Sequence, residues 1–570
     1  MKGIYGSAFL LATSLSAASL PHQNFIDDYV FSKIDNDHVP HAKLSSDSEF
    51  LRRVTLDLTG RLPEPEVVKK FLADTDPKKR DKYIDSLFPA LPTMGVGRRL
   101  IEKPFLDRWA YFFSDLFRND EQLREGTDIF NNYLYKSLEL NVPYDQMVRD
   151  MVTATGLSTW TSGPANFIAR ERVMDGDGYS VMNHEDTADE IAIWTSKLFL
   201  GVNIECVSCH DGRGHLEKVN LWLSQKKRAD LWRQAAFFGK TYVAPSYGRF
   251  PEFTVSDTEK GYDLATKSTV RMPRHATDIT PTFMLTGEKL APGKREREAY
   301  ADMLIANPQF ARAAVNLFWA QLMGRGIVDP VFGFDMARQD PANPPPAPWT
   351  IQPSHPELLN ALADDFRSHN YDLRHLLKMM VSSTTYQLST EMDGPRTAAV
   401  DEHFAAHIVR RLSAEETWDA ISQAANVFDE MKSLYGPKTY KRLLQASFYH
   451  DYEGKFRDVY NLLQCFGQTD REEMPSDRSS LVQSASLLNS DPVLKRIKVQ
   501  KGGRLDALLN ANPRLSDSEI VRELFLATIS RYPTPQEESV GVKLLAGNRE
   551  QGVEDLFWAL INRIDFIFNT

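Results

Sequence analysis

Cysteine is scarce in this sequence, with only three among 570 residues. So few thiols exclude the class of small secreted domains that disulfides hold together. An excess of positive charge is also missing, because 77 acidic residues outnumber 67 lysines and arginines and leave a net charge of −10. Since binding to a nucleic-acid backbone requires a basic surface, we expect no nucleic-acid partner. We interpret the short basic cluster Lys226–Arg228 as a solvated helix face.

Long apolar runs are absent beyond the N-terminal region, so we expect no transmembrane segment in the mature chain. At the N-terminus, Lys2 precedes an apolar stretch from Ala8 to Leu15 and the small residues Ser16–Ala18. This pattern is typical of a secretory signal peptide, which we assign to residues 1–18; an uncleaved anchor is the alternative. The mature protein is therefore expected to be periplasmic or secreted.

Most of the remaining chain has apolar residues at helical spacing, which predicts a mainly α fold with two large helical domains. We place a cytochrome-type helical domain at residues 19–240 and a companion helical domain at 291–570. Between them, residues 241–290 form a small β-containing connector, because FTVSD and TKSTVRM alternate in polarity.

Local sequence signals inside these domains predict two helix starts and one aromatic helix. Ser45 or Ser46 is expected to cap a helix, and Ser413 with Glu416 forms a capping box. The stretch Phe105–Phe117 carries aromatic residues at helical spacing. Such a stripe is typical of a core helix, and a cofactor pocket is the alternative.

Two of the three cysteines lie in the pentapeptide Cys206-Val207-Ser208-Cys209-His210. C-x-x-C-H is the attachment motif of a c-type haem, in which the two thiols add to the haem vinyl groups. Cys206 and Cys209 would form the thioethers, and His210 would be the proximal iron ligand. The predicted export agrees with this interpretation, since haem c is attached outside the cytoplasm. The third cysteine, Cys465, is expected to be a buried thiol.

Three other interpretations of the motif remain open. A disulfide between Cys206 and Cys209 suits an oxidising compartment. A zinc site formed by Cys206, Cys209, His210 and His215 has suitable ligand types. A redox dithiol of the thioredoxin kind also contains C-x-x-C.

Longer motifs carry a family resemblance. FIDDYVFSKI, FLRRVTLDLTGRLPEPEVVKKFLAD and FLGVNIECVSCHDGRGHLEKVNLW follow one another in the first half, and SHPELLNALADDF, YDLRHLLKMMVSSTTYQLS and LFLATISRYPTPQE in the second. The first half resembles the cytochrome-type domain of unknown function that is abundant in planctomycetes and acidobacteria. The second half resembles the domain of unknown function that follows it in those bacteria. Together the two resemblances cover nearly all of the mature chain.

The resemblance implies a secreted cytochrome whose reaction is not established. It also implies a partner, since such proteins are often encoded beside a secreted sulfatase- or phosphatase-like protein. Many members carry a histidine two residues after the C-x-x-C-H, where this sequence has Gly212. No second C-x-x-C-H is present, so we expect one haem.

The ligand in the sixth iron position would decide what such a haem does, because a strong ligand favours electron transfer and an open position allows small molecules to bind. His215 is our first candidate for this ligand, since it lies beside the motif. Arg213 and Lys218 are candidate partners of the haem propionates. Weaker candidates for the sixth ligand are Met182, His184, Met272 and His275.

Three functions are therefore weighed. The first is a monohaem c-type cytochrome-like protein that exchanges electrons with a redox partner protein. The second is a haem-dependent oxidoreductase with an open iron position and a substrate pocket formed with the second domain. The third is a non-haem scaffold or carbohydrate-associated binding protein whose cysteines form a disulfide or bind zinc.

Overall fold

The fold is described from a computed structural model, over residues 20–90, 103–175, 181–246, 251–432, 439–446, 457–465 and 490–570. The predicted signal peptide, residues 1–18, lies outside these residues. Helices dominate the described parts, and each sheet there has two strands, which confirms the prediction of a mainly α fold. No helix in these segments has both the length and the apolar character needed to cross a bilayer.

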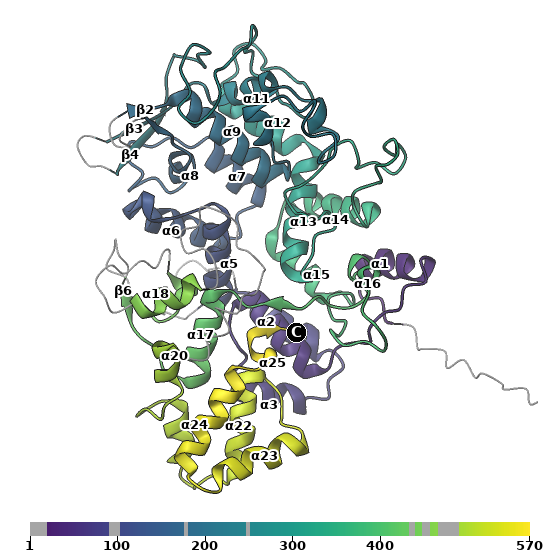
Figure 1. The fold of residues 1–570 in the computed structure, drawn as a ribbon, viewed down its shortest axis with the longest axis vertical. Coiled ribbons are helices and arrows are strands. Elements are labelled where there is room, and N and C mark those ends of the chain that lie inside the picture. The colour runs from purple at the N-terminus through teal and green to yellow at the C-terminus, as the bar shows by residue number, and fades with distance from the viewer. Residues whose placement is uncertain are drawn as a thin grey trace, which may run out of the picture.

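The molecule is elongated, with an upper and a lower group of helices joined by a central layer (Figure 1). The upper group consists of α7 (Tyr144–Val152), α8 (Ala165–Arg170), α9 (His184–Leu200), α11 (Arg228–Ala235) and α12 (Glu296–Ala306). The central layer contains α5 (Pro104–Leu116), α6 (Glu125–Glu139), α13 (Pro308–Met323), α14 (Pro356–Ser368) and α15 (Leu373–Ser382). The lower group contains α2 (Asp47–Thr59), α3 (Pro65–Ala73), α17 (Ala414–Ala425), α18 (Arg457–Gln464), α20 (Asp491–Arg496), α22 (Asp517–Ile529), α23 (Pro535–Leu545), α24 (Arg549–Ile561) and α25 (Ile564–Ile567).

The remaining elements are short or peripheral. They are α1 (Phe25–Asn36), α4 (Lys79–Leu87), α10 (Cys206–Cys209), α16 (Ala398–Glu402) and α21 (Arg504–Leu509), with the strand pairs β1 (Met174–Asp175) and β2 (Val181–Met182), β3 (Thr241–Pro245) and β4 (Phe253–Asp257), β5 (Arg410–Arg411) and β8 (Phe568–Asn569), and β6 (Met431–Lys432) and β7 (Thr439–Tyr440). All four pairs are antiparallel.

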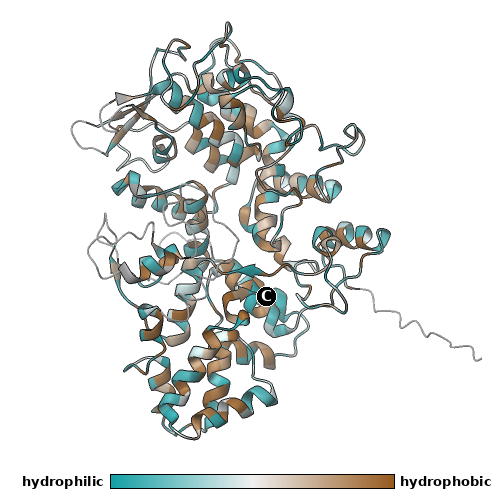
Figure 2. Cartoon of the chain, viewed as in Figure 1, coloured by the Kyte–Doolittle hydropathy of each residue, from teal (hydrophilic) through white to brown (hydrophobic). Residues whose placement is uncertain are grey.

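Buried apolar side chains form two clusters that do not follow the predicted domain limits. The first cluster lies mainly between Ile26 and Ala406, with Leu526 added, and so includes helices from both sides of the predicted connector. The second lies mainly between Leu412 and Phe566. Hydrophobic and hydrophilic residues alternate along the helices of both groups (Figure 2), as expected when each helix buries one face.

Helix α2 connects these two clusters. The Ser46 side chain accepts the Glu49 N–H at 3.2 Å and caps the helix, as predicted. Every residue from Phe50 to Thr59 is buried, and Leu56 belongs to the second cluster although its neighbours in α2 belong to the first. The helix ends at Gly60, whose φ of +63° favours glycine. An N-terminal helix thus contributes side chains to both clusters.

The connector is only partly β. The predicted strand FTVSD is β4, which pairs with β3. The prediction that TKSTVRM, residues 266–272, forms a strand is wrong. Backbone groups of this segment bond to side chains instead of to a neighbouring strand. The Thr269 N–H donates to the Asp186 carboxylate at 2.9 Å, and the Arg271 N–H donates to Ser268 Oγ at 2.8 Å. We call residues 266–275 the strap.

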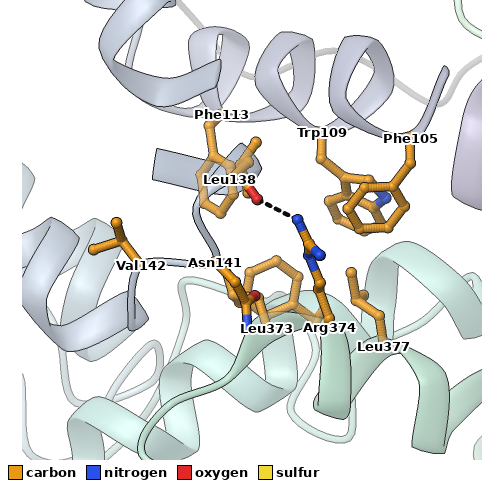
Figure 3. Close-up of a pocket in the computed structure, with 10 residues that line it drawn as sticks. Phe105, Trp109, Phe113, Leu138, Asn141, Val142, Leu373, Arg374 and Leu377 are labelled. Atoms are coloured by element: carbon orange, nitrogen blue, oxygen red, sulfur yellow. Dashed lines mark hydrogen bonds between the residues drawn. The ribbon is translucent and has the colours of Figure 1, made fainter. Parts of the chain in front are cut away.

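The aromatic helix α5 belongs to the core, as predicted. Phe105, Trp109 and Phe113 point into the space between α5 and α15 (Figure 3). The cavity there measures about 10 Å³, which is room for at most one water molecule. Arg374 closes it by donating from Nη2 to the Leu138 carbonyl at 2.8 Å. This stripe therefore holds no cofactor pocket.

Candidate haem-attachment site

Helix α9 brings the chain to the C-x-x-C-H motif. It ends at Gly201, whose φ is +68° and whose carbonyl accepts the Phe334 N–H at 3.0 Å. The motif itself forms the single turn of α10. Val207 and Ser208 are buried and anchor this turn, whereas Cys206 and Cys209 are exposed. Both thiols are therefore presented on the surface beside a fixed backbone.

His210 follows this turn in a defined orientation. Its Nδ1 lies 2.9 Å from the Asp211 carbonyl oxygen. Because a carbonyl can only accept a hydrogen bond, Nδ1 carries the proton and Nε2 keeps its lone pair. This is the tautomer in which a histidine binds iron through Nε2 while a backbone carbonyl orients the ring.

Arg228, the first residue of α11, ties the motif to the strap. Its Nε donates to the Ser208 carbonyl at 3.2 Å, and its backbone N–H donates to Asp211 Oδ1 at 2.9 Å. The other end of the guanidinium donates to the carbonyls of Met272 at 2.7 Å and Pro273 at 3.0 Å. The strap is therefore held beside the motif.

This role of Arg228 corrects the interpretation of residues 226–228 as a solvated helix face. Lys226 is half-buried, with Nζ 4.2 Å from the centre of the Trp222 ring. Of the three residues, only Lys227 is exposed. Sequence reasoning missed Arg228, and the available signal was a basic residue at a helix start shortly after the motif.

The Cys206 thiol lacks the lowered pKa that a redox dithiol requires. Burial, followed by the charge of Glu205, raises the pKa of the Cys206 thiol. A reactive dithiol requires a lowered pKa, because the thiolate is the nucleophile. Neither Cys206 nor Cys209 forms a disulfide. The third cysteine, Cys465, is half-buried, and its thiol donates to the Asn461 carbonyl at 3.2 Å.

His215 lies beside His210 and does not face it across an open space. Their ring centroids are 4.2 Å apart, and the planes are inclined by 34°. Two metal–nitrogen bonds of about 2 Å, plus the distance from each nitrogen to its ring centre, would separate the centroids by about 6 Å. An iron ion therefore does not fit between the rings in this arrangement. The role of His215 as sixth ligand stays a prediction, and it requires the loop after the motif to move.

The other candidate residues are distributed differently. Arg213 and Lys218 are exposed near the motif, where propionate contacts stay a prediction. His184 stacks on Tyr242 at 4.8 Å, and burial lowers its pKa. Met272 is 62% exposed on the strap that Arg228 holds beside the motif. The exposed His275 lies on the same strap, whereas Met182 lies in β2.

The motif residues do not form a ready-made zinc site. Over the described residues, no group of three or more donor atoms from Cys206, Cys209, His210 and His215 lies within 4.8 Å of one another. A structural zinc ion requires four such donors around one point. Zinc binding at the motif would need the side chains to rearrange.

Gly212 is enclosed by the segment before α11. Its N–H donates to the Lys226 carbonyl at 2.8 Å. A Cβ atom at this position would lie 1.9 Å from the Leu223 carbonyl oxygen. The histidine that many related proteins carry here therefore does not fit this backbone.

We expect Gly212→Ala to lower the free energy of unfolding by about 1–3 kcal/mol, because backbone atoms must move to admit the methyl group. Denaturant unfolding measures the change. Gly261→Ala is the matched control, since nothing lies within 4 Å of a Cβ at Gly261. Equal stability of the two variants would contradict this account of the loop.

Comparison with known families gives two matches in order along the chain. Residues 25–241 match the model PSCyt2, described as a protein of unknown function (DUF1549). Residues 296–545 match PSD1, described as a protein of unknown function (DUF1553). The chain therefore carries these two domains of unknown function in N-to-C order, as the sequence resemblance implies. No curated protein and no solved structure matches it. The C-x-x-C-H lies within the PSCyt2 match, and the strap lies between the PSCyt2 and PSD1 matches.

Proposed function

We propose that this protein is an exported, monohaem c-type cytochrome-like protein that exchanges electrons with a partner protein. The observation that carries the proposal is the His210 tautomer, with Nδ1–H directed to the Asp211 carbonyl and Nε2 left as a ligand, directly after two exposed thiols. The strap and Arg228 support it, since they keep the turn of α10 fixed.

The motif residues and the haem would have separate roles in electron transfer. Haem c, when bound, supplies a one-electron iron couple. Cys206 and Cys209 would hold it through thioether bonds, and His210 would provide a nitrogen ligand to the iron. Because both thiols lie at the surface, the attached group would be close to a docked partner. The partner we propose is another exported protein, and the family resemblance favours a sulfatase- or phosphatase-like one.

A visible spectrum of the full chain, purified from a host that matures haem c, tests the proposal. We expect a sharp α-band after reduction and retention of the haem in denaturant. A control cytochrome that is matured in the same host shows that the maturation machinery works. A colourless protein beside a coloured control would refute the proposal.

The sixth ligand separates electron transfer from the alternative, a haem enzyme with an open iron position. His215 is too close to His210 to face it across an iron ion, and Arg228 holds the backbone of Met272 beside the motif, so we propose Met272 in place of His215 as the residue that would close that position. Met272→Ala should then bind carbon monoxide with a shift of the Soret band, whereas the parent protein and His215→Ala should not. A parent protein that already binds carbon monoxide would favour the haem enzyme.

A further inference from the structure

The turn between α14 and α15 gathers two imidazoles around one carboxylate. His375 Nε2 lies 2.8 Å from Asp365 Oδ2. His369 Nδ1 lies 2.9 Å from the Asp365 carbonyl oxygen and 3.3 Å from Asp365 Oδ1, so Nδ1 carries the proton and Nε2 keeps the lone pair. The two rings stack with centroids 3.7 Å apart and planes inclined by 19°, so they must move apart for both to bind one ion. One donor atom from each residue lies within 4.8 Å of the other two, and no other such group occurs over the described segments.

The backbone fixes these three side chains. Asp365 and His369 are one turn apart at the end of α14, where His369 is the C-cap. Asn370 and Tyr371 then adopt φ values of +52° and +54°, which reverse the chain direction tightly. Asp372 caps α15 by accepting the N–H groups of Arg374 and His375. The reversal of the chain therefore brings the His375 ring next to the Asp365 carboxylate.

The local charge favours a cation. The C-terminal end of α14 carries the negative end of the helix dipole. The nearby Arg374 is turned away, since its guanidinium donates to the carbonyls of Pro89 and Leu138, each at 2.8 Å. The side chains of Asp365, His375 and His369 are 19%, 33% and 48% exposed, so an ion has access from solvent.

We propose that Asp365, His369 and His375 bind a divalent transition-metal ion of the zinc type. Two imidazoles and one carboxylate are a ligand set that such ions prefer, and three protein ligands leave further positions to water. The ion links the end of α14 to the start of α15. The site shares no residue with the C-x-x-C-H motif and does not depend on the haem proposal.

Isothermal titration of zinc chloride into the full chain, after treatment with a chelator, tests the site. The titration is done in a Cys206→Ser, Cys209→Ser background so that thiols do not compete for zinc. We expect one zinc ion per chain. His369→Ala, His375→Ala and Asp365→Asn should each weaken binding about tenfold or more.

His403→Ala is the matched control. Its Nε2 lies 2.7 Å from Asp37 in a pair of one histidine and one carboxylate, so its loss should leave zinc binding unchanged. Melting curves with and without zinc check the folding of every variant. Undiminished binding in the His369→Ala, His375→Ala double variant would overturn the proposal. The proposal would also fail if the variants lowered the melting temperature by the same amount with and without zinc. The cluster would then stabilise the fold only through its hydrogen bonds.

Discussion

Replacing both Cys206 and Cys209 by serine removes all covalently bound haem from the purified protein. A serine hydroxyl does not form the thioether, and these are the only two cysteines beside His210. Each single variant should keep one thioether and show a shifted α-band in the pyridine haemochrome spectrum. Extraction with acidified organic solvent measures the effect, because covalent haem stays with the protein and non-covalent haem does not.

Cys465→Ser is the matched control for this experiment. Cys465 lies after α18 and has no histidine beside it in sequence, so its replacement should leave covalent haem unchanged. Haem that resists extraction in the Cys206→Ser, Cys209→Ser variant would place the attachment elsewhere and contradict the assignment.

The second large effect is expected at Arg410, in a buried network that joins the two halves of the chain. Arg410 donates to Asp57 Oδ1 at 3.1 Å and to Glu416 Oε2 at 2.7 Å. Asp57 is 2% exposed and Glu416 is 1% exposed. Arg410→Ala leaves both carboxylates without this cation, and breaking a buried ion pair in this way costs about 3–5 kcal/mol. Denaturant unfolding measures the loss.

The pH dependence of this loss identifies its cause. Burial alone would raise the pKa of Glu416, but Arg410 and Arg108 outweigh burial and lower it from 4.5 to about 2. A lowered pKa stabilises the fold above pH 4.5, and this contribution disappears as the pH falls towards 2. The difference between the parent protein and Arg410→Ala should therefore shrink over that range. Burial raises the pKa of Asp57, so its protonation on acidification also narrows the difference.

Lys43→Ala is the control for surface ion pairs. Lys43 and Asp393 are 83% and 89% exposed at their side chains, so the pair is screened by water. We expect no measurable change in unfolding from this substitution. If Arg410→Ala behaved like Lys43→Ala, the network would not support the junction between the two halves.

Local sequence signals predicted the helices well because their causes are local. In the capping box at the start of α17, the Ser413 side chain accepts the Glu416 N–H at 3.1 Å, and the Ser413 N–H donates to Glu416 Oε2 at 2.9 Å. The aromatic helix α5 was likewise identified as core from its spacing alone. Both signals span only a few residues of chain.

The features that the sequence did not reveal depend on contacts between distant segments. Arg228 contacts Met272, 44 residues away, and no periodicity indicates such a bond. The segment TKSTVRM was predicted to be a strand because its polarity alternates, although its backbone groups bond to side chains such as that of Asp186 in α9. His375 meets Asp365 only because the chain reverses between α14 and α15.

The position of α2 also constrains the order in which the chain acquires its structure. Arg52 donates to the Thr528 and Phe566 carbonyls at 2.9 and 2.8 Å, the second across 514 residues of sequence. Contacts with such separation form late, because closing a long loop costs entropy before any contact compensates for it. A PSCyt2 domain folding by itself would lack both carbonyl acceptors of this guanidinium. Helix α2 therefore reaches its final environment only after α22 and α25 have been synthesised. The two halves complete their folding together.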